Sequence, residues 1–174
     1  MVKRGILIFP RFENEDIINK LRKKHDASVD KVRPHITLVF PFESDIGSVE
    51  LKEHIITTLS GVKTFDLSLK GITFAEERDN HLYLNVYDGT EEIIDIHKKL
   101  YTGILEGFFP DFLKKVNFLP HMTIGNLIYD EKSEENLYEI KNFNEVFNCR
   151  INEIAVEYLT EDWNSIREFN VFLE

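Results

Sequence analysis

The chain has 174 residues, 43 % of them hydrophobic and 30 % charged, and its formal net charge at pH 7 is −10. This composition is typical of a globular protein, for which we expect one two-lobed domain over residues 1–174, and its acidity argues against tight binding to duplex nucleic acid. A single cysteine, Cys149, excludes an intrachain disulfide, and no leader peptide or membrane-length apolar run is visible, so we expect a cytoplasmic protein without a membrane partner.

The first half of the chain predicts a strand, a helix, a strand, a helix and a strand. Residues 5–9 form a short apolar run typical of a buried strand, and residues 13–26 predict a helix that carries much of the positive charge on a solvated face. A strand over 35–40 and a helix over 48–60 are expected next. The alternating apolar and polar residues of 65–70 then predict the third strand.

The second half repeats this order. The clean alternation of residues 81–87 predicts a half-buried strand. Thr90, followed by two glutamates, is a good helix start, because a hydroxyl can cap the helix and acidic side chains suit its first turn. The remaining elements that we expect are a strand, a helix and two final strands in a hairpin: 121–128, 131–141, 150–159 and 165–173.

The repeated order indicates an α+β fold built from a duplicated unit. Helices must bury one apolar face, and strands with one apolar face suit packing beneath them. We therefore expect a bilobal arrangement in which two antiparallel sheets form a central cleft and the helices lie outside. The strand order within each sheet does not follow from the sequence.

The most informative feature is a short motif that occurs twice, 86 residues apart. Pro34–Leu38 and Pro120–Ile124 both read Pro-His-apolar-Thr-apolar. Alternate side chains of a strand point to opposite faces, so the histidine and threonine of each motif share one face and the apolar residues share the other. Proline is tolerated at the start of a strand and marks that start here. Two such strands can bring two imidazoles and two hydroxyls around one small ligand.

This set of side chains suits acid–base chemistry on a phosphate. Histidine transfers protons well near neutral pH, because its unperturbed pKa is about 6.5. We therefore interpret His35 and His121 as a general acid and a general base, and the residues alone leave open which is which. Thr37 and Thr123 are predicted to bind substrate by donating hydrogen bonds to the non-bridging phosphate oxygens. No metal site and no cofactor are expected, since the sequence lacks a cysteine pair, a His-Glu-x-x-His helix and a glycine-rich phosphate loop.

The strings Pro34–Phe42 and Pro120–Ile124 resemble the two motifs of the two-histidine phosphoesterases. They are most similar to those of the 2′-5′ RNA ligase-like group, which includes RNA 2′,3′-cyclic phosphodiesterases. Motif order, motif separation and chain length all match, so the resemblance covers most of the chain. It implies a bilobal fold and hydrolysis of a strained cyclic phosphodiester. It also makes the reverse reaction conceivable, in which a 2′,3′-cyclic end is joined to a 5′-hydroxyl.

Three functions are open at this point. The favoured one is metal-independent hydrolysis of a 2′,3′-cyclic phosphodiester at an RNA end or in a small nucleotide. The second is a phosphoesterase acting on 2′-5′ linkages or on another small cyclic nucleotide, and the third is a non-catalytic module that binds a nucleotide or RNA. The expected partner is a small nucleotide or an RNA terminus, because residues 35–174 hold 12 lysines and arginines against 26 acidic residues and repel a long polyanion.

Two weaker features also concern the cleft. His81 shares a strand face with Tyr83 and Asn85, and this face could line the cleft. Trp163, in the expected hairpin turn, could stack on a base. Packing within the protein is the commoner role for both histidine and tryptophan at such positions.

Overall fold

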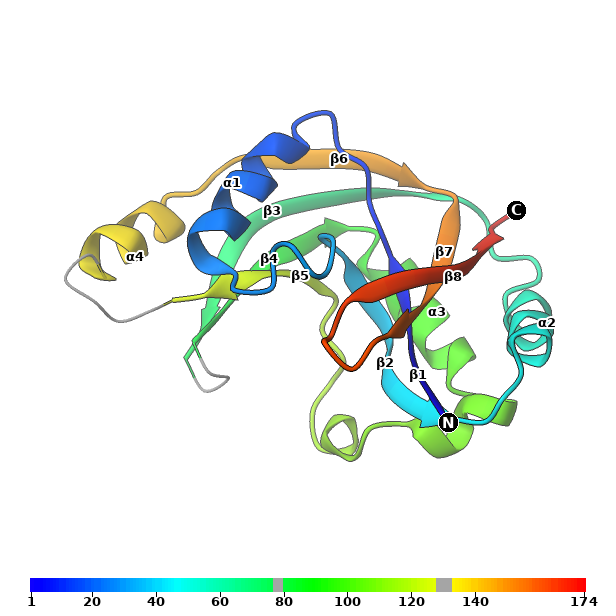
Figure 1. Ribbon diagram of the computed structural model, residues 1–174. Helices are drawn as coiled ribbons and strands as arrows, with labels where there is room; N and C mark the ends of the chain where they lie inside the picture. Colours follow the sequence, from blue (N-terminus) through cyan, green and yellow to red (C-terminus); the bar gives the residue numbers. More distant parts are fainter. Residues whose placement is uncertain (77–79, 128–132) are drawn as a thin grey trace.

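A computed structural model describes residues 1–76, 80–127 and 133–174 (Figure 1). In the described residues the elements are, in chain order, β1 (Val2–Ile8), α1 (Glu15–His25), β2 (Ile36–Ser44), α2 (Ser48–Thr58), β3 (Phe65–Ala75), β4 (His81–Asp88), α3 (Thr90–Leu100), the 3₁₀ turns η1 (Gly103–Phe108) and η2 (Asp111–Lys114), β5 (His121–Asn126), α4 (Ser133–Lys141), β6 (Val146–Ile151), β7 (Glu153–Leu159) and β8 (Ser165–Phe172). This order agrees with the α+β prediction. Residues 128 and 131–132, which we expected to end a strand and begin a helix, lie outside the described residues.

One predicted strand is divided in two. We expected a single strand over 150–159, but β6 ends at Ile151 and β7 begins at Glu153. The break at Asn152 lets the chain cross the sheet, because β6 pairs with β3 whereas β7 pairs with β1 and β8. The turns η1 and η2, between α3 and β5, were not predicted either.

The strands form one curled antiparallel sheet in the order β6-β3-β4-β5-β2-β1-β7-β8 (Figure 1). The prediction of two separate sheets is therefore wrong. The two halves of this sheet are joined where β2 meets β5, through the single residue pair Ile36 and Met122. Both side chains are fully buried, so burial of apolar surface holds the two motif strands together at this point.

The sheet does not consist of two independent repeats either. β3 follows the first motif in sequence, yet it pairs with β4 and β6 in the half that contains the second motif. The hairpin of β7 and β8 completes the other half by pairing with β1. Close chain neighbours, β3 and β4, thus pair with each other, as sequential strands usually do.

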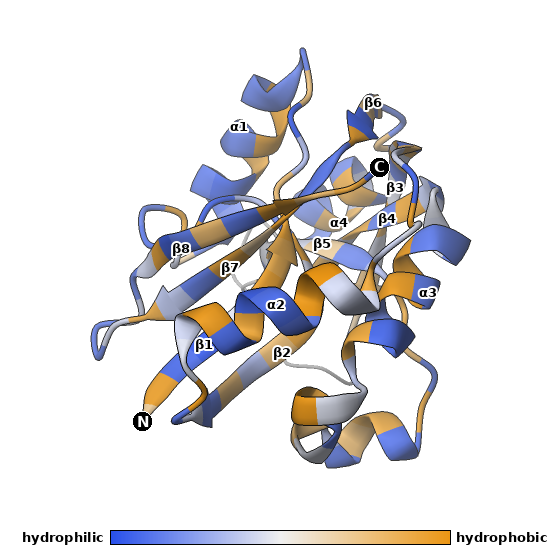
Figure 2. Ribbon diagram, turned by 90° about the vertical axis from the view of Figure 1, so that its right-hand side faces the viewer, coloured by the Kyte–Doolittle hydropathy of each residue, from blue (hydrophilic) through white to orange (hydrophobic). Residues whose placement is uncertain are grey.

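Each helix that precedes a motif strand packs against the motif strand of the other half. α1 contacts β5, and α3 contacts β2. α1 and α4 lie at one end of the sheet and α2 and α3 at the other (Figure 1), and the strands are striped with hydrophobic and hydrophilic residues (Figure 2). The core is continuous between the sheet and the helices, and it includes residues of β2, β5, α1 and α3.

Candidate active site

The register of β2 and β5 brings the two predicted motifs together. The paired residues, Ile36 and Met122, are the central residues of the two His-x-Thr triplets. On these strands the apolar residues next to the histidines and threonines are fully buried: Ile36, Leu38, Met122 and Ile124. The predicted alternation of a core face and an open face is confirmed, because the histidine and threonine of each triplet are partly exposed.

Antiparallel pairing determines which motif residues face each other. If the register of Ile36 and Met122 continued by one residue in each direction, Thr37 would lie across from His121 and His35 across from Thr123. Side chains directly opposite on neighbouring strands have Cβ atoms about 5 Å apart. The register at Ile36 and Met122 thus places the two predicted motifs next to each other in the sheet.

A backbone hydrogen bond orients each histidine ring. The Nδ1 atom of His35 lies 2.8 Å from the carbonyl oxygen of Arg33, and that of His121 lies 2.8 Å from the carbonyl oxygen of Leu119. A carbonyl oxygen only accepts hydrogen bonds, so Nδ1 is the protonated nitrogen and Nε2 carries the lone pair of the neutral ring. The two motifs thus present their imidazoles in the same tautomer.

Sequence reasoning missed these two bonds, although a signal for them exists. In both motifs the residue whose carbonyl accepts the bond lies two positions before the histidine, and a proline stands between that residue and the histidine. Proline restricts the residue before it to an extended conformation. This restriction favours the same path of the chain, and the same carbonyl position, at both sites.

The surroundings of His35 make its neutral form the stable one. Burial lowers the pKa of His35 below its ordinary value of 6.5, and the hydrogen bond to the Arg33 carbonyl opposes this shift only in part. The carboxylate of Glu157 also raises this pKa, but by less than burial lowers it. His35 is therefore suited to accepting a proton near neutral pH.

The surroundings of His121 are aromatic. The ring of Tyr83, on β4, lies with its centroid 3.8 Å from that of His121 at an interplanar angle of 36°. Tyr83 pairs with Thr123 in the ladder of β4 and β5, and its side chain is mostly buried. Of the three residues that we placed on one face of β4, Tyr83 is thus in direct contact with a motif histidine.

The two histidines line different hollows. His121 lines a cavity of about 500 Å³ whose wall is rich in aromatic side chains: Phe40, Tyr83, Phe112 and Phe118. His35 lines a smaller one of about 230 Å³, together with Glu157 and Trp163. The size of the first lies within the range of small-molecule sites in proteins.

Phe112 and Phe118 are site residues that sequence reasoning missed. Both belong to the stretch between α3 and β5, for which the sequence predicted no element. A cluster of phenylalanines in a stretch without a helical or strand period could have been the signal. Trp163 lies in the turn between β7 and β8 with its side chain 55 % exposed, and the Nζ atom of Lys3 is 3.8 Å from its ring centroid.

The described part of the chain holds no group of three histidine, cysteine or acidic side chains placed to bind a metal ion. Within the same residues, no helix is long and apolar enough to cross a membrane.

Two His-x-Thr motifs on adjacent antiparallel strands, in the centre of a curled sheet, define the class of the two-histidine phosphoesterases. The sequence profile of the 2′-5′ RNA ligase superfamily matches residues 9–163. The chain belongs to this superfamily. The resemblance carried by the two motifs is thereby confirmed.

Related proteins support the same assignment. The chain is 32 % identical over 135 residues to a protein of Oceanobacillus iheyensis and 28 % identical over 141 residues to one of Bacillus licheniformis, both named "putative phosphoesterase". These matches cover 76 % and 80 % of this chain, and 76 % and 80 % of the relatives. A crystal structure of Escherichia coli LigT complexed with ATP superimposes with a TM-score of 0.59 at 14 % identity, over 99 % of this chain and 98 % of that one, and so shares the fold.

Proposed function

We propose that the protein hydrolyses a 2′,3′-cyclic phosphodiester at an RNA end or in a small nucleotide, without a metal ion. The observation that carries this proposal is the register at Ile36 and Met122. We infer that this register brings an imidazole and a hydroxyl from each motif to one phosphate, which is the arrangement that proton transfer and charge stabilisation need.

In the proposed reaction His35 is the general base and His121 the general acid. Neutral His35 takes a proton from water through Nε2 as the water oxygen attacks phosphorus. The bond between phosphorus and one ribose oxygen breaks, and the imidazolium form of His121 gives its Nε2 proton to that oxygen. The product is a ribose monophosphate with one free hydroxyl. Reprotonation of His121 and deprotonation of His35 by water restore the enzyme.

Thr37 and Thr123 donate hydrogen bonds to the two non-bridging oxygens in this proposal. Negative charge on these oxygens grows as water adds to phosphorus, so donors held in place stabilise the transition state more than the ground state. With each threonine across from the histidine of the other motif, a donor would lie on both sides of the phosphate. The same groups could also join a cyclic end to a 5′-hydroxyl, because that hydroxyl can take the place of water: His35 would take its proton, and His121 would protonate the leaving ribose oxygen.

The aromatic cavity next to His121 is the proposed site for the nucleobase. Phe40 packs edge-on against Phe112 and Phe118, with centroid distances of 5.2 and 6.4 Å, and Phe118 is stacked on His97 at 3.7 Å. A base that stacks on such a wall gains about 1–3 kcal/mol. That E. coli LigT was crystallised with ATP is consistent with a nucleotide in this fold.

The test is turnover of adenosine 2′,3′-cyclic phosphate by the purified protein in EDTA, with the product followed by phosphorus NMR. We expect a single monophosphate, 2′ or 3′, because only one ribose oxygen can lie next to His121. A variant that combines His35→Ala with His121→Ala, purified in the same way, is the control for a contaminating phosphodiesterase. Binding without turnover would support the non-catalytic alternative, and activity that needs an added divalent ion would contradict the proposed mechanism.

A further inference from the structure

Two arginines next to His35 have no part in the proposed reaction. Arg33, whose carbonyl binds the His35 ring, donates from Nη2 to Oε1 of Glu157 at 2.9 Å. Arg167, on β8, donates from Nε to the same oxygen at 3.0 Å. The hydroxyl of Ser165 donates to the other carboxylate oxygen, so both oxygens of Glu157 are bonded. We call Arg33 and Arg167 the arginine pair.

The charges of this cluster do not cancel. Glu157 is only 2 % exposed, and a buried carboxylate needs a cation nearby. One arginine would supply it, but two converge on the same oxygen, which leaves one net positive charge. A guanidinium has five N–H donors; Arg33 donates one bond to Glu157, and Arg167 donates one to Glu157 and one to Oδ1 of Asn170, so donors remain on both. Arg33 is moreover 57 % exposed, so a ligand in solution can reach it.

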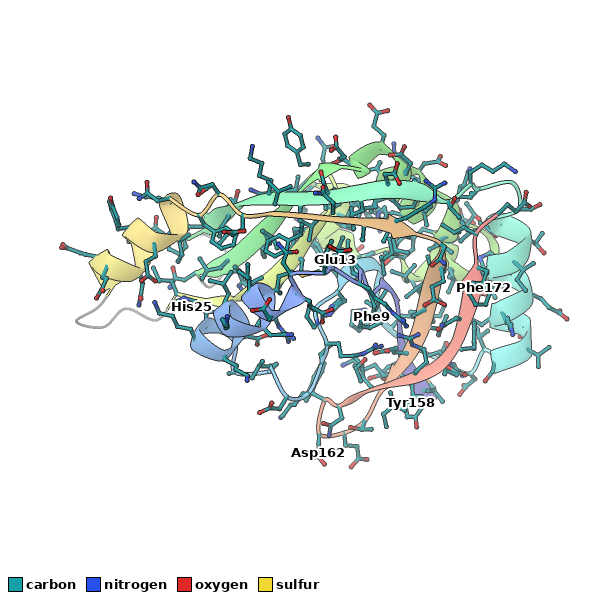
Figure 3. The ribbon with its side chains drawn as sticks, turned by 90° about the horizontal axis from the view of Figure 1, so that it is seen from above. Phe9, Glu13, His25, Tyr158, Asp162 and Phe172 are labelled. Atoms are coloured by element: carbon teal, nitrogen blue, oxygen red, sulfur yellow. The ribbon has the colours of Figure 1, made fainter. Side chains whose placement is uncertain are left out.

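The arginine pair is held in place by an aromatic ring. Phe9, which follows β1, lies between α1 and β7 (Figure 3), and the Cζ atoms of Arg33 and Arg167 are 4.1 and 4.9 Å from its ring centroid. Stacked and hydrogen-bonded guanidinium groups lose little further freedom when they bind an anion. The arginine pair is thus preorganised to bind an anionic ligand through two guanidinium groups.

The arginine pair lies within reach of the site between the two motifs where we propose that the cyclic phosphate binds. The Phe9 centroid is 5.9 Å from that of His35, so the Arg33 guanidinium is at most about 10 Å from the His35 ring. A single nucleotide spans a comparable length. A ligand with one phosphate at the motifs could therefore place a second phosphate against the arginine pair.

We propose that Arg33 and Arg167 form a binding subsite for a second phosphate, the one on the 5′ side of the nucleotide that carries the cyclic phosphate. This inference rests on the proposed function and specifies its substrate. With the base in the aromatic cavity beside His121, the nucleotide would lie across the motifs with its 5′ side toward β7 and β8. The phosphate would be either a terminal 5′-phosphate or the phosphodiester that joins the preceding nucleotide.

This arrangement also limits how much RNA the site holds. The body of the protein beyond residue 34 is strongly acidic, and it repels phosphates farther along the strand. We therefore expect a gain from one added phosphate and none from further nucleotides.

The test compares three substrates: adenosine 2′,3′-cyclic phosphate, the same compound with a 5′-phosphate, and the dinucleotide with a 2′,3′-cyclic end. For the wild type we expect kcat/KM to rise by about tenfold with the 5′-phosphate, mainly through a lower KM, because charge-assisted hydrogen bonds are among the strong ones. An equal rise with the dinucleotide identifies a phosphodiester as a ligand. A rise with the 5′-phosphate alone identifies the terminal phosphate as the ligand.

The variants Arg33→Gln and Arg167→Gln should lower the gain from the 5′-phosphate. The ratio of kcat/KM for the 5′-phosphorylated compound to kcat/KM for adenosine 2′,3′-cyclic phosphate should be close to one in each variant. The ratio is taken within each variant, so an indirect effect on His35 cancels. Arg150→Gln is the matched control, because Arg150 is an exposed arginine paired with Asp66, and its ratio should equal that of the wild type. Arg33→Gln still leaves Glu157 paired with Arg167, so it tests the subsite even if Arg167→Gln does not fold.

A binding measurement separates failure of the subsite from failure of the proposed function. By calorimetry, adenosine 2′,5′-bisphosphate should bind the wild type about tenfold more tightly than adenosine 2′-monophosphate, and Arg33→Gln should remove the difference. Equal affinities, or a difference that survives Arg33→Gln, would overturn the subsite whether or not the protein turns over a cyclic phosphate. Binding as expected without hydrolysis would leave the subsite supported and the proposed reaction refuted.

Discussion

At the scale of single residues, the two histidines differ in their surroundings although both rings make the same kind of bond through Nδ1. Each Nδ1 atom bonds a carbonyl two residues earlier. His35, however, lies near a buried carboxylate and two arginines, whereas His121 contacts the ring of Tyr83. Two groups with unlike surroundings can hold unlike protonation states at one pH, as acid–base catalysis requires.

We expect His35→Ala and His121→Ala each to lower the turnover of a cyclic phosphate by about 10²–10⁴-fold, the usual effect of removing a general acid or base. The fold should remain, since neither side chain belongs to the buried core. His54→Ala is the control, because His54 lies on α2, away from the motifs. Near-normal turnover by either motif variant would rule out a two-histidine mechanism.

Thr37→Ala and Thr123→Ala should each lower kcat by about 10²-fold, with a smaller effect on KM, because a donor to a developing oxyanion acts chiefly in the transition state. Thr37→Ser and Thr123→Ser keep the hydroxyl and should retain most of the activity. Steady-state kinetics of the four variants on one cyclic nucleotide check this. If serine were as damaging as alanine, the hydroxyl would not be the group that matters.

At the scale of elements, the contact between α1 and β5 depends on one glycine. Gly125 follows Thr123 by two residues and has φ +134. A Cβ atom built there would lie 2.2 Å from the carbonyl oxygen of His25, the last residue of α1. The backbone of α1 can approach the second motif strand this closely because glycine has no side chain.

Gly125→Ala should therefore lower the free energy of unfolding by more than about 2 kcal/mol, since both the backbone conformation and the space exclude a methyl group. Urea unfolding followed by circular dichroism measures this. Gly107→Ala, where nothing lies within 4 Å of the added Cβ, should change the stability by much less. Equal effects of the two substitutions would show that the approach of α1 has no energetic importance.

At the scale of the whole molecule, three buried or half-buried imidazoles make the stability depend on pH. Burial lowers the pKa values of His25, His35 and His97 below 6.5. His97, on α3, also binds the carbonyl oxygen of Leu38, on β2, at 2.7 Å. Because the unfolded chain binds protons at these three sites more readily than the folded one, stability rises with pH between the folded and the unfolded pKa values.

The free energy of unfolding should consequently be lower at pH 5.5 than at pH 7.5. Substituting one of the three imidazoles by a group that does not titrate, as in His25→Gln, should make this pH dependence shallower. Urea unfolding at several pH values measures both. A stability that is constant or rises as the pH falls through 6.5 would contradict the assignment of these imidazoles as neutral in the folded state.

The two halves of the molecule have a similar order of helices and strands, but different side chains surround their motifs. The segment between α1 and the first motif is short and mostly polar, whereas the segment between α3 and the second motif contributes Phe112 and Phe118 to a cavity. The two similar motifs thus have dissimilar surroundings. Under the proposed function, a substrate with one base and several phosphates would therefore bind in a single direction.

Local patterns in the sequence determined most of the elements and the candidate site. Alternation with period two placed His35 and Thr37 on one face of a strand, and did the same for the second motif, because side chains alternate in every strand. The order of helices and strands followed from similar short-range periodicity. These features depend on residues close together in the chain, which is why one sequence sufficed to predict them.

Only the tertiary structure decided which strands are neighbours and what surrounds the motifs. That β2 meets β5 in one sheet, and that β3 joins β6, are pairings between distant segments, which no local period encodes. Likewise Arg33 and Glu157 are 124 positions apart, and a buried carboxylate with its cations is visible only once β7 lies beside β1. The groups that we propose for proton transfer could thus be predicted from short motifs, whereas the shape and charge around them arise from contacts between segments far apart in sequence.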